Sequence, residues 1–186
     1  VGSEMCIRDR FKPDLRFEDF SKDFLLKLMY LWQYAWLQMA GSWYNAIKKR
    51  WGDEAANECE QEAWVKMAER VNPRYARMAN IQLNTVLDSL KAAQLPLDNS
   101  IGLFPCEYEI KNPNHVIMTV RECRTLTYME KSAPERIYPL CHVNEKPFLE
   151  KYYINPKIKV KPLKLPPRKS LDEVACVWEI KLETRA

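Results

Sequence analysis

Residues 95–111, LPLDNSIGLFPCEYEIK, mark the point at which the hydrophobic period of the chain changes. Before this stretch, apolar residues recur every three to four positions, which is typical of amphipathic helices. After it, apolar and charged residues alternate: Cys106, Tyr108 and Ile110 against Glu107, Glu109 and Lys111. Such alternation indicates strands that are buried on one face. The sequence therefore predicts an α+β protein, with a helical half over residues 11–94 and a sheet half over residues 95–186.

The helical half predicts three helices packed on the sheet. The first starts near Ser21 and ends at Gly52, because glycine readily takes the left-handed conformation that stops a helix. The second follows directly. Asn72 and Pro73 then favour a new start, since asparagine caps a helix and proline suits its first position. The third helix is expected to end near residue 94.

The sheet half predicts an antiparallel sheet of about four strands with one short intervening helix. The expected strands cover residues 106–111, 115–123, 157–161 and 174–183. The short helix is expected to begin at Asn144 and to end before Asn155 and Pro156. The last strand has the clearest alternation, and it places Cys176 on the face that points into the core.

Residues 28–47 contain no charged side chain over 20 positions, which is the length of a membrane-spanning helix. Polar residues interrupt the stretch, and its aromatic residues run through the middle instead of gathering at the two ends. These features favour a helix buried in the fold or in a homodimer interface over a membrane span.

Length and composition limit the function classes. With 186 residues, a single domain over residues 11–186 is expected. The net charge of +4 is modest and spread along the chain, so nucleic acid is not an expected partner. With only 4 glycines, neither a dinucleotide fingerprint nor a phosphate-binding loop is present, and no nucleotide cofactor is expected.

The first ten residues, VGSEMCIRDR, resemble translated sequencing-adapter read-through and are expected to be a non-native leader. They lack the apolar run of a secretory signal. The cysteines are therefore expected to be free thiols in a reducing cytoplasm, not disulfides.

Cys123, Cys141 and Cys176 are the main candidates for chemistry, because each falls at the end of or within an element of the sheet half. Three interpretations stay open: a zinc site, a nucleophile, or buried thiols that line a pocket. Glu145 follows Cys141 closely and is a candidate oxygen ligand for zinc. No C-x-x-C pair is present, although such pairs are what make a zinc prediction strong. A nucleophilic Cys141 would need His115 or His142 as its base.

A ligand pocket is the second candidate site. Its expected lining comes from the first helix and from the sheet: Trp36, Trp43, Tyr44, Arg121 and Trp178. Arginine is a good partner for an anionic ligand. The alternative is that the aromatic side chains are plain core and that Arg121 lies at an edge in water.

Several segments resemble an uncharacterised family of small prokaryotic cytosolic proteins. They are FSKDFLLKLMYLWQYAWLQMAGSWYNAIKKRWGDEAA, ECRTL, LCHV, INPKIKVKPLKLPPRKS and ACVWEIKLE. The family is distantly similar to L-2-amino-thiazoline-4-carboxylic acid hydrolases and to 4-vinyl reductase-type ligand-binding domains. The resemblance implies a helical half followed by an α+β pocket domain, with zinc held by cysteine and glutamate in some relatives. Ala175 stands where relatives carry a second cysteine beside Cys176.

Together these features predict a cytosolic small-molecule-binding protein with cysteines at its pocket. As an enzyme it would hydrolyse a C–N bond in a small heterocycle or amide. Zinc held by Cys123, Cys141, Cys176 and Glu145 would activate water, or Cys141 would attack directly. The alternatives are a non-enzymatic ligand-binding or sensor module with a structural metal, and a homodimerising interaction protein.

Overall fold

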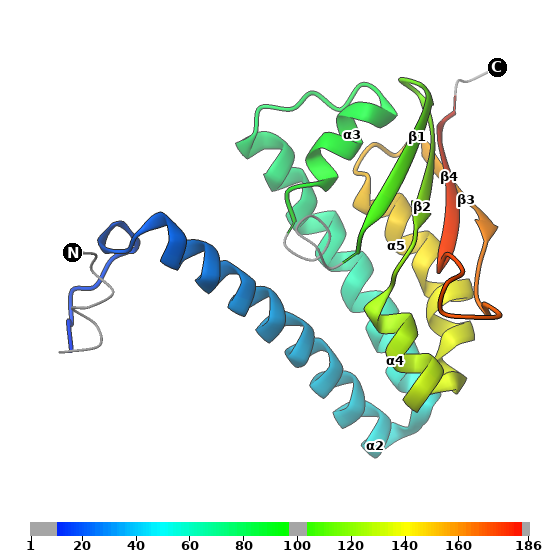
Figure 1. Ribbon diagram of the computed structural model, residues 1–186, viewed down its shortest axis with the longest axis horizontal. Coiled ribbons are helices and arrows are strands. Elements are labelled where there is room, and N and C mark those ends of the chain that lie inside the picture. The colour runs from blue at the N-terminus through cyan, green and yellow to red at the C-terminus, as the bar shows by residue number, and fades with distance from the viewer. Residues whose placement is uncertain (1–10, 97–103, 184–186) are drawn as a thin grey trace. The chain divides into compact units, whose positions relative to one another are not determined.

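The computed structural model describes residues 11–96 and 104–183, so the expected leader lies outside the described residues. The fold is the α+β architecture that the change of period predicts, with several helices and an antiparallel sheet of 4 strands (Figure 1). The chain divides into two compact units, Val1–Ala46 and Ile47–Ala186. Each unit is described by itself.

Helix α2 (Lys22–Met78) contains the expected break at Gly52, where the backbone leaves the helical conformation with φ 88° and ψ 177°. Only glycine takes this conformation without strain. The restart expected at Asn72 and Pro73 is wrong, because α2 continues through both residues to Met78. Asn72 is buried and donates a side-chain hydrogen bond to the Tyr152 carbonyl at 3.0 Å, so its amide serves a tertiary contact in place of a cap.

Helix α3 (Val86–Ala93) begins after a separate cap. The Thr85 hydroxyl accepts a hydrogen bond from the Asp88 N–H, and the Asp88 carboxylate accepts one from the Thr85 N–H. This reciprocal pair satisfies two backbone donors at the helix start. The third helical segment therefore starts only at Val86, after α2 has ended at Met78, which is later than the sequence pattern indicated.

The sheet lies in the second unit and consists of β1 (Cys106–Asn112), β2 (His115–Val120), β3 (Ile158–Lys164) and β4 (Cys176–Leu182). Its strand order is β1-β2-β4-β3, and all neighbours are antiparallel. In the register, Val116 pairs with Ile180 and Met118 pairs with Trp178. These four side chains are buried, so the central strands supply the floor of the core.

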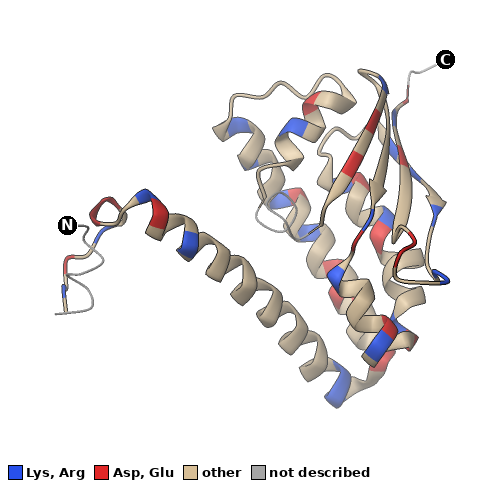
Figure 2. Ribbon diagram, viewed as in Figure 1, with Lys and Arg blue, Asp and Glu red and all other residues tan. Residues whose placement is uncertain are grey.

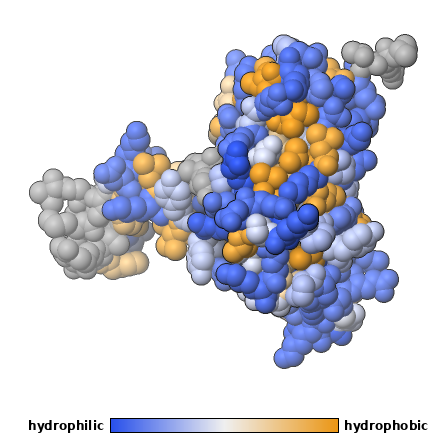
Figure 3. All heavy atoms as spheres, turned by 45° about the vertical axis from the view of Figure 1, so that its right-hand side comes forward, coloured by the Kyte–Doolittle hydropathy of each residue, from blue (hydrophilic) through white to orange (hydrophobic). Residues whose placement is uncertain are grey.

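Helices cover one face of this sheet (Figure 1). The core between them combines strand residues with buried side chains from α3, from α4 (Arg124–Ser132) and from α5 (Glu145–Tyr152). The helical contribution includes Leu90, Leu126, Met129, Leu149 and Tyr152. The other face of the sheet is mixed: on the sheet side of the second unit, hydrophobic atoms lie among hydrophilic ones (Figure 3). One face is therefore the core face, as the alternating pattern predicts.

The segment between β2 and α5 differs from the expectation. The strand predicted to reach Cys123 ends at Val120, and Cys123 instead caps α4, a helix that the pattern did not predict. A short 3-10 turn and the π-helix η3 (Tyr138–Asn144) follow. Helix α5 then begins directly after Asn144, where the short helix was expected.

The first unit contains a 3-10 turn (Phe17–Asp19) and the first part of α2. Many large apolar side chains of this helix are exposed, so the expectation of a buried helix does not hold for them. Among the described residues, no helix combines the length and apolarity needed to cross a membrane.

Candidate functional site

Two cysteines begin strands that flank β2. Cys106 is the first residue of β1 and Cys176 is the first residue of β4, and both are aligned with Val120 between them. Val120 is buried. Directly paired residues point to the same face, so both thiols lie on the helix-covered face. With strands about 4.8 Å apart, their Cα atoms are about 10 Å apart, which is too far for a disulfide.

Cys123 and Cys141 come from the segments that follow β2. Cys123 is the N-cap of α4, and its Sγ accepts a hydrogen bond from the Leu126 N–H at 3.3 Å. Cys141 lies within η3, which leads directly into α5. π-helices are rare overall, and those that do occur are frequently found at functional sites. We call Cys106, Cys123, Cys141 and Cys176 the four inner cysteines: all are free thiols, half-buried and packed against the core of the second unit.

The four inner cysteines share electrostatic partners. Burial is the main cause that raises the pKa of each thiol, and the negative charge of Glu145 raises all four pKa values further. Charge on Cys123 also raises the pKa values of the other three thiols. Such interactions weaken with distance. Thiols from four separate segments therefore share the first residue of α5 as an electrostatic partner.

Hydrogen bonds and one positive charge partly offset the effect of burial on the pKa values of the thiols. Trp178 Nε1 donates to Cys176 Sγ at 3.2 Å. This bond lowers the pKa of Cys176, yet burial still raises that pKa to about 12. A hydrogen bond with Tyr108 acts in the same direction on the pKa of Cys106. Arg168 adds a positive charge that lowers the pKa of Cys123. Burial outweighs these effects, so the thiols are protonated at neutral pH.

Alkylation should show this protonation directly. Cys176, with its pKa raised from 9.0 to about 12, has a thiolate fraction at pH 8 about 1000-fold below that of an unperturbed thiol. We expect Cys176 to react with iodoacetamide at least about 100-fold more slowly in the native protein than in denaturant. Below pH 9 the native rate should rise about tenfold per pH unit. Peptide mass spectrometry measures each site separately, and a native Cys176 that reacts as fast as the unfolded chain would contradict the burial argument.

The two histidines engage other groups. His142 Nε2 lies 2.7 Å from the Pro166 carbonyl oxygen. His115 Nε2 lies 2.9 Å from Glu179 Oε1. A cysteine nucleophile needs a base within hydrogen-bond reach, and these contacts engage both imidazoles elsewhere. The raised pKa of Cys141, caused first by burial and then by Glu145, also opposes a resting thiolate.

The predicted pocket residues are spread over both units. Trp36, Trp43 and Tyr44 lie on the part of α2 that belongs to the first unit, whereas Arg121 and Trp178 belong to the second. Trp178 is 1% exposed and is part of the core. The exposed side chain of Arg121 forms an ion pair with Glu107 of the neighbouring strand.

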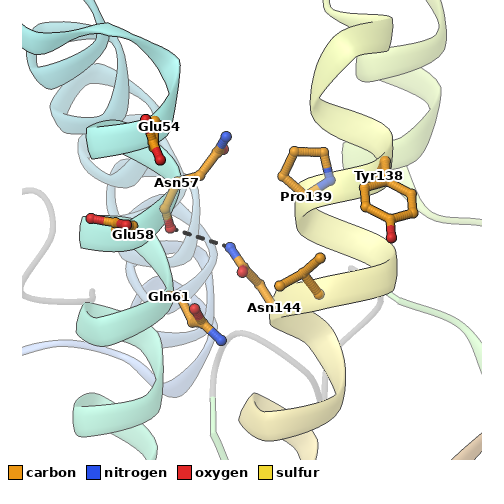
Figure 4. A pocket seen from close by; sticks show the side chains of 8 residues that line it. Glu54, Asn57, Glu58, Gln61, Tyr138, Pro139 and Asn144 are labelled. Atoms are coloured by element: carbon orange, nitrogen blue, oxygen red, sulfur yellow. Dashed lines mark hydrogen bonds between the residues drawn. The ribbon is translucent and has the colours of Figure 1, made fainter.

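A groove of about 400 Å³ lies between α2 and η3 in the second unit (Figure 4). It is lined by Glu54, Asn57, Glu58 and Gln61 on α2 and by Tyr138, Pro139, Val143 and Asn144 on η3. The Asn144 side chain points toward α2 and donates a hydrogen bond to the Asn57 carbonyl at 3.3 Å (Figure 4). The volume lies within the range of small-molecule sites. The π-helix thus presents one side to the groove while its Cys141 packs against the core.

The donor chemistry of the inner cysteines and Glu145 fits a soft divalent ion, because zinc prefers thiolate ligands and accepts carboxylate oxygen. The arrangement of these side chains, however, is not that of a metal site. Within residues 11–96 and 104–183, no set of three or more His, Cys, Asp or Glu side chains is arranged so that it could hold a metal ion. These donors interact electrostatically, but among the described residues they form no coordination sphere.

Cys106 is the residue that sequence reasoning missed. The alternation over residues 106–111 placed its side chain on the same face as Tyr108 and Ile110, but only as an apolar position. Its alignment across Val120 with Cys176 depends on the strand order, which the sequence pattern does not reveal. The groove was missed for the same kind of reason, since it requires η3 to lie beside α2.

The fold and these side chains define a class of α+β protein in which free thiols lie at the edge of the core. The chain belongs to a family of unknown function, DUF6125, whose model matches residues 18–182. No curated protein and no solved structure matches the chain. The function must therefore be argued from the side chains themselves.

Proposed function

We propose that this protein binds a soft metal ion, zinc in the first instance, through a cluster formed by the four inner cysteines and Glu145. One observation carries the proposal: the charge of Glu145 raises the pKa of all four half-buried thiols, which come from separate segments, and charge on Cys123 raises the pKa of the other three. Such groups repel one another once ionised. A divalent cation relieves that repulsion and deprotonates coordinating thiols.

Hydrogen bonds to sulfur support this proposal. The Leu126 N–H and the Trp178 ring N–H donate to Cys123 and Cys176 respectively. Donors of this kind stabilise thiolates and orient metal ligands. A cysteine side chain has one rotatable bond, so a change of rotamer moves Sγ without moving the backbone.

Five candidate donors are compatible with either a structural or a catalytic zinc ion. A structural zinc is closed by four protein ligands, whereas a catalytic zinc keeps an open position for water. The set expected from the sequence already offers four donors, and Cys106 adds a fifth candidate. With all ligands from the protein, the metal would stabilise the fold in a non-enzymatic module. The proposal requires a reducing compartment, because the thiols must stay free.

Metal content is the test. We expect about one zinc per chain in protein purified without an affinity tag, and its loss in Cys141→Ser. Cys59→Ser is the matched control, because Cys59 is a free thiol on α2 and is not among the cysteines packed against the core. Cadmium titration should show Cys141→Ser weakening affinity by at least about 100-fold. Affinity should rise with pH, since binding displaces protons from the thiols. Metal-free wild-type protein that does not bind cadmium, or unchanged binding in Cys141→Ser, would end the proposal.

Small-molecule binding in the groove between α2 and η3 is the second candidate function. The groove combines carboxylates and amides on α2 with the Tyr138 ring and apolar side chains on η3. The surface that lines the groove is almost entirely apolar, which favours an apolar ligand. A small ligand is also what the resemblance expected from the sequence implies, and hydrolysis of a C–N bond is the reaction class that this resemblance suggests.

A further inference from the structure

The first part of α2 carries a regular stripe of large apolar side chains. Met29, Trp32, Trp36, Met39 and Trp43 follow one another at spacings of 3, 4, 3 and 4 residues. This alternation is the a/d pattern of a helix that packs against another helix. We call these five residues the tryptophan stripe. All of them belong to the first unit, so the pattern depends on a single helical segment.

The tryptophan stripe is exposed. Its side chains are between 37% exposed at Met29 and 66% exposed at Met39. Large aromatic side chains bury about 150–250 Å² each when they are covered. Covering the exposed part of all five would remove about 500 Å² from water on one helix, and about 1000 Å² over two such helices. This is the size at which a specific protein interface begins.

The positions that flank the stripe contain no charge. In the heptad pattern they are Leu28, Gln33, Ala35, Ala40 and Ser42, and no Lys, Arg, Asp or Glu occurs between residues 28 and 47 (Figure 2). Flanking charges are what select a different helix as the partner of a coiled coil. Without them, the best complement to the stripe is the same stripe, since a two-fold axis pairs each residue of one copy with its counterpart in the other.

The absence of charge also makes a membrane surface a poor partner for the stripe. Helices that lie on membranes carry lysine and arginine on their polar face. The middle of this helix has neither residue, and no described helix is able to cross a membrane. A protein partner that is itself apolar and helical fits the stripe better.

We propose that the tryptophan stripe is a homodimer interface, in which the first part of α2 pairs with the same segment of a second copy of this chain. The interface lies outside the four inner cysteines and does not depend on metal binding. The two proposals therefore succeed or fail separately.

The test compares two glutamate substitutions on the same helix. Met39→Glu places a charge in the stripe at a side chain that is already 66% exposed, so the single chain should tolerate it. Leu31→Glu is the matched control, because Leu31 is 59% exposed and lies off the stripe. Light scattering after gel filtration and sedimentation velocity measure the mass, and far-UV circular dichroism checks that both variants remain helical.

We expect the wild-type protein and Leu31→Glu to have twice the chain mass of 22.0 kDa, and Met39→Glu to have the mass of one chain at the same concentration. A single-chain mass for the wild type at every concentration would overturn the proposal. Binding of that monomer to phosphatidylcholine vesicles would identify a membrane surface as the partner instead. A dimeric Met39→Glu, or equal dissociation of both variants, would also overturn the proposal.

Discussion

Replacing Trp178 with alanine is expected to lower the free energy of unfolding by about 3–5 kcal/mol. Trp178 lies in the central strand β4, is 1% exposed, and is among the largest fully buried side chains of the protein. Its removal leaves a cavity that the surrounding strands and helices fill only in part, so the cost includes lost contacts as well as lost burial. It also removes the N–H donor to Cys176.

Urea denaturation of the second-unit fold measures this loss through the linear dependence of the unfolding free energy on denaturant. Leu163→Ala is the control: Leu163 lies on β3 and is 51% exposed, so its truncation should change stability by about 0.5 kcal/mol or less. If Trp178→Ala cost no more than Leu163→Ala, the placement of Trp178 at the centre of the core would be wrong. Trp178→Phe, which retains most of the volume, should lie between the two.

Arg168→Ala is expected to cost about 3 kcal/mol, near the low end of the range for breaking a buried ion pair. The Arg168 side chain is 3% exposed and forms two hydrogen bonds to the Glu130 carboxylate, at 2.9 and 2.8 Å. It also donates to the Thr127 hydroxyl at 3.1 Å and to the Leu171 carbonyl at 3.3 Å. Removal leaves Glu130, which is 21% exposed, with an uncompensated charge that water hydrates only in part.

The double variant Arg168→Met with Glu130→Leu separates the buried charge from the packing. Replacing both partners with apolar side chains of similar volume is often close to neutral. We therefore expect the double variant to recover most of the stability that Arg168→Ala loses. Arg121→Ala is the exposed control, and its unfolding free energy should stay within experimental error of the wild type. A double variant as unstable as Arg168→Ala would show that the loop after β3 depends on contacts other than this pair.

Local sequence patterns were sufficient for the architecture. The period of two over residues 106–111 and 174–183 identified β1 and β4, and the lysine alternation over residues 157–161 identified β3. Gly52 marked the break in α2 because its positive φ is a property of the residue type. For the strands and for Gly52, the decisive preference lies within a few residues. Asn144 stands directly before α5 as expected, but its side chain makes no capping hydrogen bond and donates to the Asn57 carbonyl instead.

Local patterns failed where a tertiary contact competed with a local preference. Asn72 is of a residue type that favours helix caps. Its side chain instead donates a hydrogen bond to the Tyr152 carbonyl, and α2 continues through it. The sequence pattern places Cys123 at the end of a strand, yet its Sγ caps α4. The π-helix η3 was also missed, since the period of the apolar residues did not distinguish it from other helical turns.

The candidate site shows the same division. Residue type and alternation identified Cys123, Cys141, Cys176 and Glu145 as possible donors, and they placed Cys176 on the core face. Cys106 joined them only through the strand order β1-β2-β4, which aligns it with Val120 and Cys176. Strand order and helix docking are set by long-range packing, which a local pattern does not encode. Fold class and donor chemistry were therefore readable from the chain, whereas the alignment of Cys106 and Cys176 across Val120 and the groove beside η3 arose from tertiary packing.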